Sequence, residues 1–349
     1  MIKKYSQNNF SHSRRSETEI MASWASQETP LVSIICLTFN QENFICDAID
    51  GFLQQETDFP FEIIIHDDAS TDNTSKIVKE YAKKYPNIIK PIFQSENQYQ
   101  HISKNILFLA SSYAKGKYIA CCEGDDYWID SKKLQIQISE MQKHPQCATS
   151  FHTIIRRYTD TPSKHLATQK KIGTRVFPIQ EVILGGVKLC PTVSCIFKAS
   201  ILDSIPAWLI DAPVADYFIR ILGSMQGGAL YLDKVMGVYR IASVGSWTEE
   251  ISSNGHFLHS YFLKMMIAVK EIDIHTKHRY SREFEIIKKK MCFSTCANPV
   301  LTKEIRNGIY LQHKNRFGIK RKILWHFALK YQKPCRMVCF MRQCISRLC

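Results

Sequence analysis

The chain has 349 residues, of which 45% are hydrophobic, and it carries a formal net charge of +14. A chain of this length and composition can form one large domain or two small ones with a sizeable core, and it should fold unaided. No run reaches the roughly 18 apolar residues of a transmembrane helix, so a membrane-spanning protein is not expected.

The positive charge is concentrated towards the C-terminal end. Residues 1–255 hold 26 Lys and Arg against 27 Asp and Glu, whereas residues 256–349 hold 20 against 5. A neutral body is therefore followed by a basic region, and the two need separate explanations.

Thirteen cysteines are present, and several lie within apolar runs. The polar residues 1–29 lack the apolar core of a secretory signal, so we interpret the cysteines as reduced core thiols of a cytoplasmic protein. Neither Cys292 with Cys296 nor Cys335 with Cys339 has the spacing and companion ligands of a zinc site.

The first part of the chain alternates between predicted strands and helices. Residues 1–29 are rich in Ser, Asn, Gln and charge, which predicts a disordered segment. The apolar run LVSIICLTF then predicts a strand covered on both faces, the spacing of Ile45, Ile49 and Phe52 predicts a helix, and FEIIIH predicts a second strand. Such a βαβ unit predicts a parallel sheet.

The alternation continues to about residue 125. Helices are predicted at residues 75–85 and 106–113, and strands at IIKPIFQ and KYIACCE. Pro91 in the first of these strands indicates a sheet edge, because proline cannot donate to a strand ladder. The pattern is typical of an open α/β sheet flanked by helices.

The following part is mixed rather than strictly alternating. Helices are predicted at residues 132–143 and 215–225, strands at CATSFHTII, PTVSCIFK and GALYLDKVMGVYRI, and a polar loop at residues 159–174. We expect these strands to continue the same sheet.

Three polar clusters follow predicted strands, at the end of the sheet where parallel folds bind ligands. They are Thr38, Asn40 and Glu42; Asp67, Asp68 and Asp72; and Glu123, Asp125 and Asp126. The second cluster could instead cap the helix that follows it.

The third cluster has the chemistry of a metal site. Adjacent carboxylates repel one another unless a cation is present, and their hard oxygen ligands suit Mg²⁺ or Mn²⁺, which complete their shells with substrate phosphates. The chain has neither a G-x-x-x-x-G-K-[ST] loop nor a G-x-G-x-x-G loop after its first strand. We therefore interpret Glu123, Asp125 and Asp126 as a site for a metal and a diphosphate.

Four stretches resemble a known family. VSIICLTFNQENFICDAIDGFLQQ, FEIIIHDDASTDNT and GKYIACCEGDDYWIDSKKLQIQI resemble successive motifs of family 2 glycosyltransferases, which have the GT-A fold and use nucleotide-sugar donors. DYFIRILGSMQGGALYLDKVMGVYR resembles the acceptor-side segment of bacterial members that build polysaccharides. The resemblance covers about residues 31–247 and neither end of the chain.

The resemblance implies a division of the chain. Residues 30–145 would be the nucleotide-sugar-binding half and residues 146–250 the acceptor-binding half of a GT-A type, mostly parallel twisted sheet. Residues 251–349 would be a basic helical C-terminal region.

The resemblance also implies roles for particular residues. The family's D-x-D motif falls on Glu123-Gly124-Asp125, so Asp125 would be the principal ligand of Mn²⁺ or Mg²⁺, supported by Glu123 and Asp126. Glu123 replaces the first Asp of the motif and could reach the ribose or the metal. The nucleotide sugar would also be bound by Thr38, Asn40, Glu42, Asp67 or Asp68, and Arg240.

The catalytic base of the family falls on Asp216, which would deprotonate the acceptor in an inverting displacement; from the sequence alone it could also cap the following helix. Arg240 could offer positive charge to the diphosphate or be structurally paired. Many relatives have a histidine two residues after this arginine, where the present chain has Ala242.

The resemblance therefore implies a metal-assisted glycosyltransferase that moves a sugar from a nucleotide-diphosphate sugar, with a UDP-sugar favoured, to a glycan or lipid-linked acceptor in cell-surface polysaccharide synthesis. One alternative is an inactive donor-binding or membrane-scaffold protein of the same fold. A sugar-phosphate nucleotidyltransferase is a weaker alternative, because LTFNQEN lacks the glycine-rich basic loop of such enzymes.

The basic tail has its own pattern. Apolar and basic side chains separate onto opposite sides of a predicted helix at residues 322–333, as in interfacial helices on anionic lipid. This favours a cytoplasmic protein that lies peripherally on the inner face of the plasma membrane, although the helix could instead pack on the catalytic domain. No recognised motif points to nucleic acid as a partner.

Overall fold

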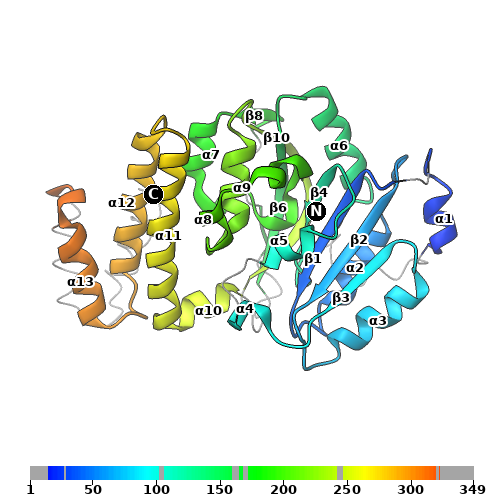
Figure 1. Ribbon diagram of the computed structural model, residues 1–349, viewed down its shortest axis with the longest axis horizontal. Coiled ribbons are helices and arrows are strands. Elements are labelled where there is room, and N and C mark those ends of the chain that lie inside the picture. Colours follow the sequence, from blue (N-terminus) through cyan, green and yellow to red (C-terminus); the bar gives the residue numbers. More distant parts are fainter. Residues whose placement is uncertain are drawn as a thin grey trace. The chain divides into compact units, whose positions relative to one another are not determined.

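A computed structural model of the protein describes residues 15–26, 29–101, 106–158, 165–167, 172–241, 247–319 and 322 (Figure 1). The chain divides into two compact units, an N-terminal unit, Met1–Ser246, and a C-terminal unit, Trp247–Cys349. Among the described residues, no helix combines the length and the apolar character needed to cross a membrane. The predicted tail helix from Ile323 onwards lies outside the described residues.

The N-terminal unit contains ten strands and nine α-helices in its described residues. The strands are β1 (Val32–Thr38), β2 (Phe61–Asp67), β3 (Ile89–Phe93), β4 (Tyr118–Cys121), β5 (Tyr127–Trp128), β6 (Thr149–Tyr158), β7 (His165–Ala167), β8 (Arg175–Phe177), β9 (Ile196–Lys198) and β10 (Ala229–Ile241). The helices are α1 (Glu17–Met21), α2 (Ile45–Leu53), α3 (Thr74–Lys84), α4 (Gln98–His101), α5 (Ile106–Ser111), α6 (Lys133–Lys143), α7 (Ile179–Gly185), α8 (Ala207–Ile210) and α9 (Ala215–Gly223).

The C-terminal unit is helical in its described residues. Its helices are α10 (Trp247–Ser253), α11 (Gly255–His275), α12 (Ser281–Cys296) and α13 (Lys303–His313).

All the strands belong to one sheet, whose main path runs β3-β2-β1-β4-β9-β6-β10-β5. The neighbours β3, β2, β1 and β4 are parallel, as predicted, and β3 with its Pro91 lies at the sheet edge. Beyond β4 the sheet is mixed, because β9 is antiparallel to both β4 and β6 while β6 and β10 are parallel. The predicted fold class is therefore confirmed.

Helices cover the sheet because their apolar residues recur at the helical period. α3 packs against β2 and β3, α5 against β1 and β2, and α6 against β6 and β10 (Figure 1). The main core joins β1 and β2 residues such as Ile34 and Ile63 to Ile49 and Phe52 of α2. These strands are buried along almost their whole length, which explains their continuous apolar sequence.

The N-terminal segment differs in part from its prediction of disorder. Residues 17–21 form α1, which begins with a capping box in which the Ser16 side chain accepts the Glu19 N–H and Glu19 accepts the Ser16 N–H. Ile20 is fully buried in the main core. The polar composition of the segment concealed one short capped helix with a single apolar anchor.

The predicted loop at residues 159–174 also differs in part. Within it, β7 pairs antiparallel with β6, so three of its residues belong to the sheet. The polar composition of the loop gave no strand signal, and the pairing depends on the neighbouring strand.

The strand ends bring the three predicted polar clusters together. Thr38 and Asp67 lie side by side in the register of β1 and β2, and the Asp68 N–H donates to the Thr38 carbonyl at 3.0 Å. The chain after β4 continues along β1, since the Gly124 N–H donates to the Leu37 carbonyl at 2.9 Å. The three clusters therefore meet at the carboxyl ends of the parallel strands.

A buried polar network fixes the start of β4 against β1. The Ser33 hydroxyl donates to the Glu62 carboxylate at 2.6 Å and accepts the Gly116 N–H at 2.8 Å, and the Lys115 N–H donates to Glu62 at 2.7 Å. A Cβ at Gly116 would lie 2.5 Å from the Ser33 nitrogen, so only glycine fits this approach.

Replacing Gly116 with alanine should therefore destabilise the protein. We expect Gly116→Ala to lower the free energy of unfolding by about 1–3 kcal/mol, because backbone atoms must move to admit the methyl group. The control is Gly308→Ala in α13, where a Cβ meets nothing within 4 Å, and which should be neutral or slightly stabilising. Chemical denaturation of the two variants checks this, and equal stabilities would contradict the packing argument.

Candidate active site

The acidic loop between β4 and β5 forms the centre of the site. Glu123, Asp125 and Asp126 each offer a carboxylate oxygen, and these oxygens lie within 4.8 Å of one another. Asp125 and Asp126 are buried and Glu123 is half-buried. The structure therefore brings the three predicted metal ligands together.

The electrostatics of this acidic loop favour a cation. Burial and the neighbouring charges of Asp125 and Asp216 raise the pKa of Glu123 to about 8. Burial and the same loop's carboxylates raise the pKa of Asp126 well above its usual range. Asp126 Oδ2 is buried and has no hydrogen-bond partner among the described residues. An unpaired buried carboxylate oxygen beside two others fits a divalent cation such as Mg²⁺ or Mn²⁺.

Arg240 at the end of β10 holds this loop in place. Its backbone N–H donates to Asp126 Oδ1 at 2.8 Å, and its Nη1 donates to the Asp125 carbonyl at 2.6 Å. Its Nη2 donates to the carboxylate of Asp47, near the start of α2. The guanidinium also lies over the rings of Phe44 and Tyr127, with centroids at 5.0 and 4.4 Å.

These contacts define the role of Arg240 in the structure. The residue is only 2% exposed, and its guanidinium pairs with Asp47 and the acidic loop. Of the two alternatives left by the sequence, structural pairing therefore describes its position. Ala242, where the family resemblance leads us to expect a histidine, lies outside the described residues.

The loop after β1 packs directly against the acidic loop. The Thr38 hydroxyl donates to Gln41 Oε1 at 2.8 Å. A Cβ at Gly124 would lie 2.4 Å from Gln41 Oε1 and 2.8 Å from the Thr38 hydroxyl oxygen. The structure thus brings Thr38 to the acidic loop, where a side chain at position 124 would displace Gln41 and Thr38.

Asn40 and Glu42 are engaged with the loop after β2. Asn40 Oδ1 accepts the Thr71 N–H at 2.8 Å, and Glu42 Oε2 accepts the backbone and side-chain N–H groups of Asn73 at 3.0 and 2.7 Å. Asp72 in turn accepts the Glu42 N–H at 3.0 Å. In this structure these side chains join two loops of the site.

The neighbours Asp67 and Asp68 have different environments. Asp67 accepts hydrogen bonds from the hydroxyls of Ser70 and Ser75, which fold the turn before α3. Asp68 accepts the N–H groups of Gln98 and Tyr99 at 2.8 and 3.0 Å. Both aspartates are buried. Through these hydrogen bonds each one stabilises a loop beside the predicted nucleotide pocket.

Asp216 lies in the first turn of α9 beside a buried arginine. Arg220 Nη1 donates to Asp216 Oδ2 at 2.8 Å and to the Cys190 carbonyl at 2.5 Å, and the Thr192 hydroxyl approaches the same Oδ2 at 3.4 Å. Among the described residues, both contacts of the Asp216 carboxylate are made by Oδ2. α9 has Val214 as its N-cap without a side-chain bond, so Asp216 does not cap it.

Sequence reasoning missed Asp47 and Arg220. Arg220 follows Asp216 by four residues, a spacing that pairs side chains on a helix and could have predicted this contact. Asp47 gave no signal, because its partner Arg240 is 193 residues away in the sequence.

The fold and the acidic loop together define an open-sheet α/β protein with a candidate ligand site at the carboxyl ends of its parallel strands. Residues 33–205 match the sequence profile of the family described as Glycosyl transferase family 2. Over this segment the chain belongs to glycosyltransferase family 2, as its motifs predict.

Two curated relatives cover part of the chain. The uncharacterized protein Rv1520 of Mycobacterium tuberculosis is 34% identical over 222 residues, which are 62% of this chain and 60% of the relative, so the match spans less than two thirds of that relative. The Escherichia coli protein WfgD, named UDP-Glc:alpha-D-GlcNAc-diphosphoundecaprenol beta-1,3-glucosyltransferase, is 35% identical over 114 residues, 33% of this chain and 42% of its own.

A solved structure shares the fold. The mannosyltransferase PcManGT from Pyrobaculum calidifontis, solved in complex with GDP-Man and Mn²⁺, has a TM-score of 0.50 and 16% sequence identity. The similarity covers 91% of this chain and 85% of that one. At this identity the comparison shows the fold alone.

The raised pKa of Glu123 predicts a pH-dependent loss of stability without metal. Because the pKa of Glu123 is about 8 in the folded protein against an ordinary 4.5, its stabilising effect is present below pH 4.5 and is lost as the pH rises through 8. We expect the thermal midpoint of the protein in EDTA to fall between pH 5 and pH 8 relative to that of Glu123→Gln.

The comparison with Glu123→Gln is needed because His152 acts in the opposite direction. Its pKa is lowered to about 3 by burial, so its contribution falls as the pH decreases below 6.5, equally in both proteins. Mn²⁺ should raise the midpoint of the unmodified protein more at pH 8 than at pH 5. An equal Mn²⁺ shift at both pH values would contradict this assignment.

The Arg240 contacts predict an effect on metal affinity. Arg240→Lys cannot reproduce a guanidinium that pairs with Asp47 and the Asp125 carbonyl together, so we expect Mn²⁺ affinity to fall about 10–100-fold in calorimetric titrations. Arg157→Lys is the control, because among the described residues the Arg157 side chain reaches just the Tyr127 hydroxyl, at 3.5 Å. Unchanged Mn²⁺ affinity in a folded Arg240→Lys protein would show that the pairing does not position the acidic loop.

Proposed function

We propose that the protein is an inverting, metal-assisted glycosyltransferase that moves a sugar from a nucleotide-diphosphate sugar to a glycan or lipid-linked acceptor. The observation that carries this proposal is the acidic loop, in which three carboxylate oxygens lie within 4.8 Å of one another and one buried oxygen has no partner among the described residues. The family match supports the reaction type.

Each residue of the site has a proposed role. Asp125, Glu123 and Asp126 hold Mn²⁺ or Mg²⁺, which when bound would neutralise the charge of the diphosphate. Thr38 and Asp68 line the nucleotide pocket, and Asn40, Glu42 and Asp67 fix the loops that form it. Arg240 acts on the donor through the acidic loop that it holds.

Asp216 is the proposed catalytic base. Its carboxylate takes the proton of the acceptor hydroxyl as that oxygen attacks the anomeric carbon, and the bond from this carbon to the diphosphate oxygen breaks, releasing the nucleoside diphosphate. Arg220 and Thr192 orient the carboxylate through Oδ2. A single displacement of this kind inverts the anomeric centre.

The relatives support finer parts of the proposal. The name of WfgD describes transfer from UDP-Glc to a lipid-diphosphate acceptor with a β-1,3 linkage, which favours a UDP-sugar donor, a lipid-linked acceptor and a place in cell-surface polysaccharide synthesis. Mn²⁺ in PcManGT supports a divalent cation. A lipid-linked acceptor in turn favours a cytoplasmic enzyme lying peripherally on the inner face of the plasma membrane.

Binding of UDP tests the proposed metal site. We expect calorimetric titration of UDP to require Mn²⁺, and Asp125→Ala to weaken binding at least about tenfold, because the cation links the carboxylates to the diphosphate. The matched control is Asp58→Ala, an exposed aspartate, which should bind UDP like the unmodified protein. If neither Mn²⁺ nor Asp125→Ala changes UDP binding, the carboxylates are structural and the proposed function loses its support.

Donor hydrolysis tests the base. With a nucleotide sugar that the protein turns over, Asp216→Asn should lower kcat about 10²–10⁴-fold while UDP binding stays within twofold. The first sugar released by the unmodified protein should have the inverted anomeric configuration in NMR spectra. Retained configuration or an undiminished kcat would reject this mechanism, and UDP binding without turnover of any donor would favour the inactive donor-binding alternative.

A further inference from the structure

Helix α11 in the C-terminal unit is apolar on two sides. One side, with residues such as Leu258 and Phe262, packs into the local core with Phe293 of α12. The other side exposes Leu263, Ile267 and Ile274, which are 46%, 61% and 47% exposed. A helix that is apolar on both sides is normally covered on both.

The exposed apolar residues form a stripe. Leu263, Ile267 and Ile274 are spaced by four and seven residues, so they lie along one face of α11 over about 16 Å at a rise of 1.5 Å per residue. Eight side chains of α11 are exposed and none of them is acidic: His256, Ser260, Leu263, Lys264, Ile267, Lys270, Ile274 and His275.

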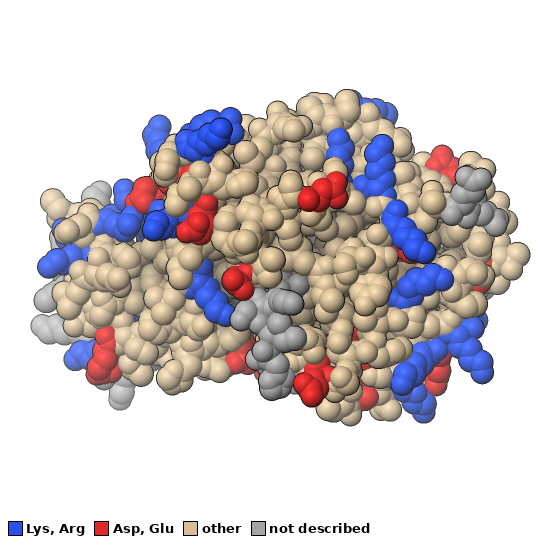
Figure 2. All heavy atoms as spheres, viewed as in Figure 1, with Lys and Arg blue, Asp and Glu red and all other residues tan. Residues whose placement is uncertain are grey.

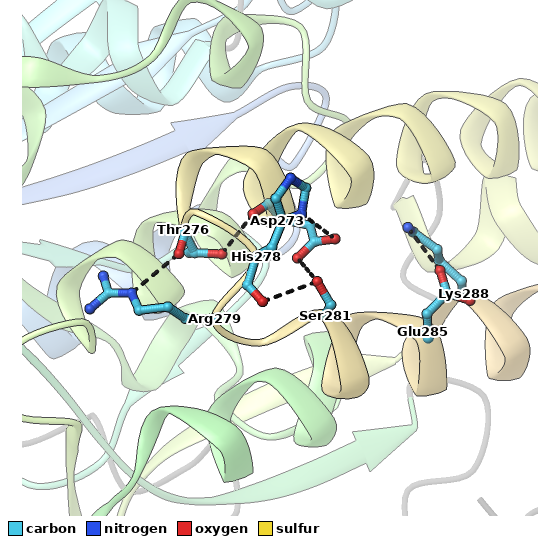
Figure 3. A network of polar contacts seen from close by, with 7 residues as sticks. All are labelled: Asp273, Thr276, His278, Arg279, Ser281, Glu285 and Lys288. Carbon is cyan, nitrogen blue, oxygen red and sulfur yellow. Dashed lines mark hydrogen bonds and ion pairs between the residues drawn. The ribbon is translucent and has the colours of Figure 1, made fainter.

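The turn from α11 to α12 extends the positive charge. Asp273 is buried, with its carboxylate held by the Ser281 hydroxyl at 2.7 Å and by His278 Nδ1 at 3.4 Å (Figure 3). Two other carboxylates near this surface, Glu271 of α11 and Glu283 of α12, are half-buried. Arg279 donates through Nε to the Thr276 carbonyl at 3.2 Å, which orders the same turn. These hydrogen bonds fix the turn, and they pair the carboxylate of Asp273 with groups inside the turn.

The cations of this turn remain at the surface. Lys277, Arg279 and Arg282 are exposed. Figure 2 shows Lys and Arg side chains, with some Asp and Glu side chains beside them, at the upper left. The apolar stripe of isoleucine and leucine is thus bordered by Lys264 and Lys270 along its length and by three more cations at one end, against one half-buried carboxylate of α11, Glu271.

The charge of this surface decides among three occupants. A symmetric pair of chains would bring together two surfaces that each carry more exposed cations than carboxylates, which like-charge repulsion disfavours. The chain's own residues 323–349, outside the described part, hold five Lys and Arg and no Asp or Glu, so they are equally unsuited to cover it. A surface of anionic lipid supplies both phosphate charge and hydrocarbon.

We infer that the exposed face of α11, with Leu263, Ile267 and Ile274 at its centre, is a docking surface for an anionic membrane. The apolar side chains enter the boundary between headgroups and acyl chains, while Lys264, Lys270 and the cations of the α11–α12 turn contact lipid phosphates. This surface goes beyond the proposed reaction, and its test does not depend on activity.

Flotation of the full chain with vesicles of phosphatidylcholine and phosphatidylglycerol tests this inference. The double variant Leu263→Ser, Ile267→Ser should lower the fraction bound to vesicles at least about tenfold in partition coefficient. The matched control is Leu311→Ser in α13, an exposed leucine at 53% exposure away from the stripe, which should float like the unmodified protein. Lys264→Gln, Lys270→Gln should weaken binding and reduce its dependence on salt.

Three outcomes would overturn the inference. The unmodified protein could fail to bind anionic vesicles, or the double variant could bind them unchanged while Lys330→Gln, Lys333→Gln in the tail abolishes binding. Sedimentation could also show a dimer that Leu263→Ser, Ile267→Ser converts to monomers, which would assign the stripe to a second copy. UDP binding should be the same in all these variants, so failure here is distinguishable from failure of the proposed function.

Discussion

Mutual repulsion among the carboxylates of Glu123, Asp125 and Asp126 is the constraint around which the N-terminal unit is organised. Burial makes each negative charge costly, and it raises the pKa of Glu123 and of Asp126. The protein offsets part of this cost with Arg240, which comes from β10, the neighbour of β5 in the sheet, and reaches both the acidic loop and Asp47. The remainder can be offset by a proton or, as proposed for the working protein, by a divalent cation.

The loops around these three carboxylates are held to one another by hydrogen bonds and close packing. Asn40 and Glu42 after β1 bond to the loop after β2, and Gln41 and Thr38 press against Gly124 of the acidic loop. Asn40 and Glu42, which the sequence predicts to contact the nucleotide sugar, thus hold the loops to one another in the structure. Such preorganisation places the remaining polar groups without a reorganisation cost when a ligand binds.

The two units carry different kinds of chemistry. The N-terminal unit concentrates buried charge at one edge of its sheet, whereas the described C-terminal unit carries its cations on the surface beside an apolar helix face. The uneven charge along the chain therefore has a structural counterpart: internal carboxylates near the proposed reaction, and external cations suited to an anionic surface. Because the proposed acceptor class includes lipid-linked glycans, both features are compatible with work at a membrane.

The sequence by itself determined the alternation of strands and helices, the sheet edge at Pro91 and the meeting of the polar clusters, because apolar periodicity and parallel strand ends are local properties. It also determined the three carboxylates of the acidic loop. Only the tertiary structure decided that Arg240 pairs with Asp47, since nothing local marks partners 193 residues apart. Likewise, α1 was concealed by polar composition, and the outer stripe of α11 became apparent only when packing had shown which apolar side chains stay exposed.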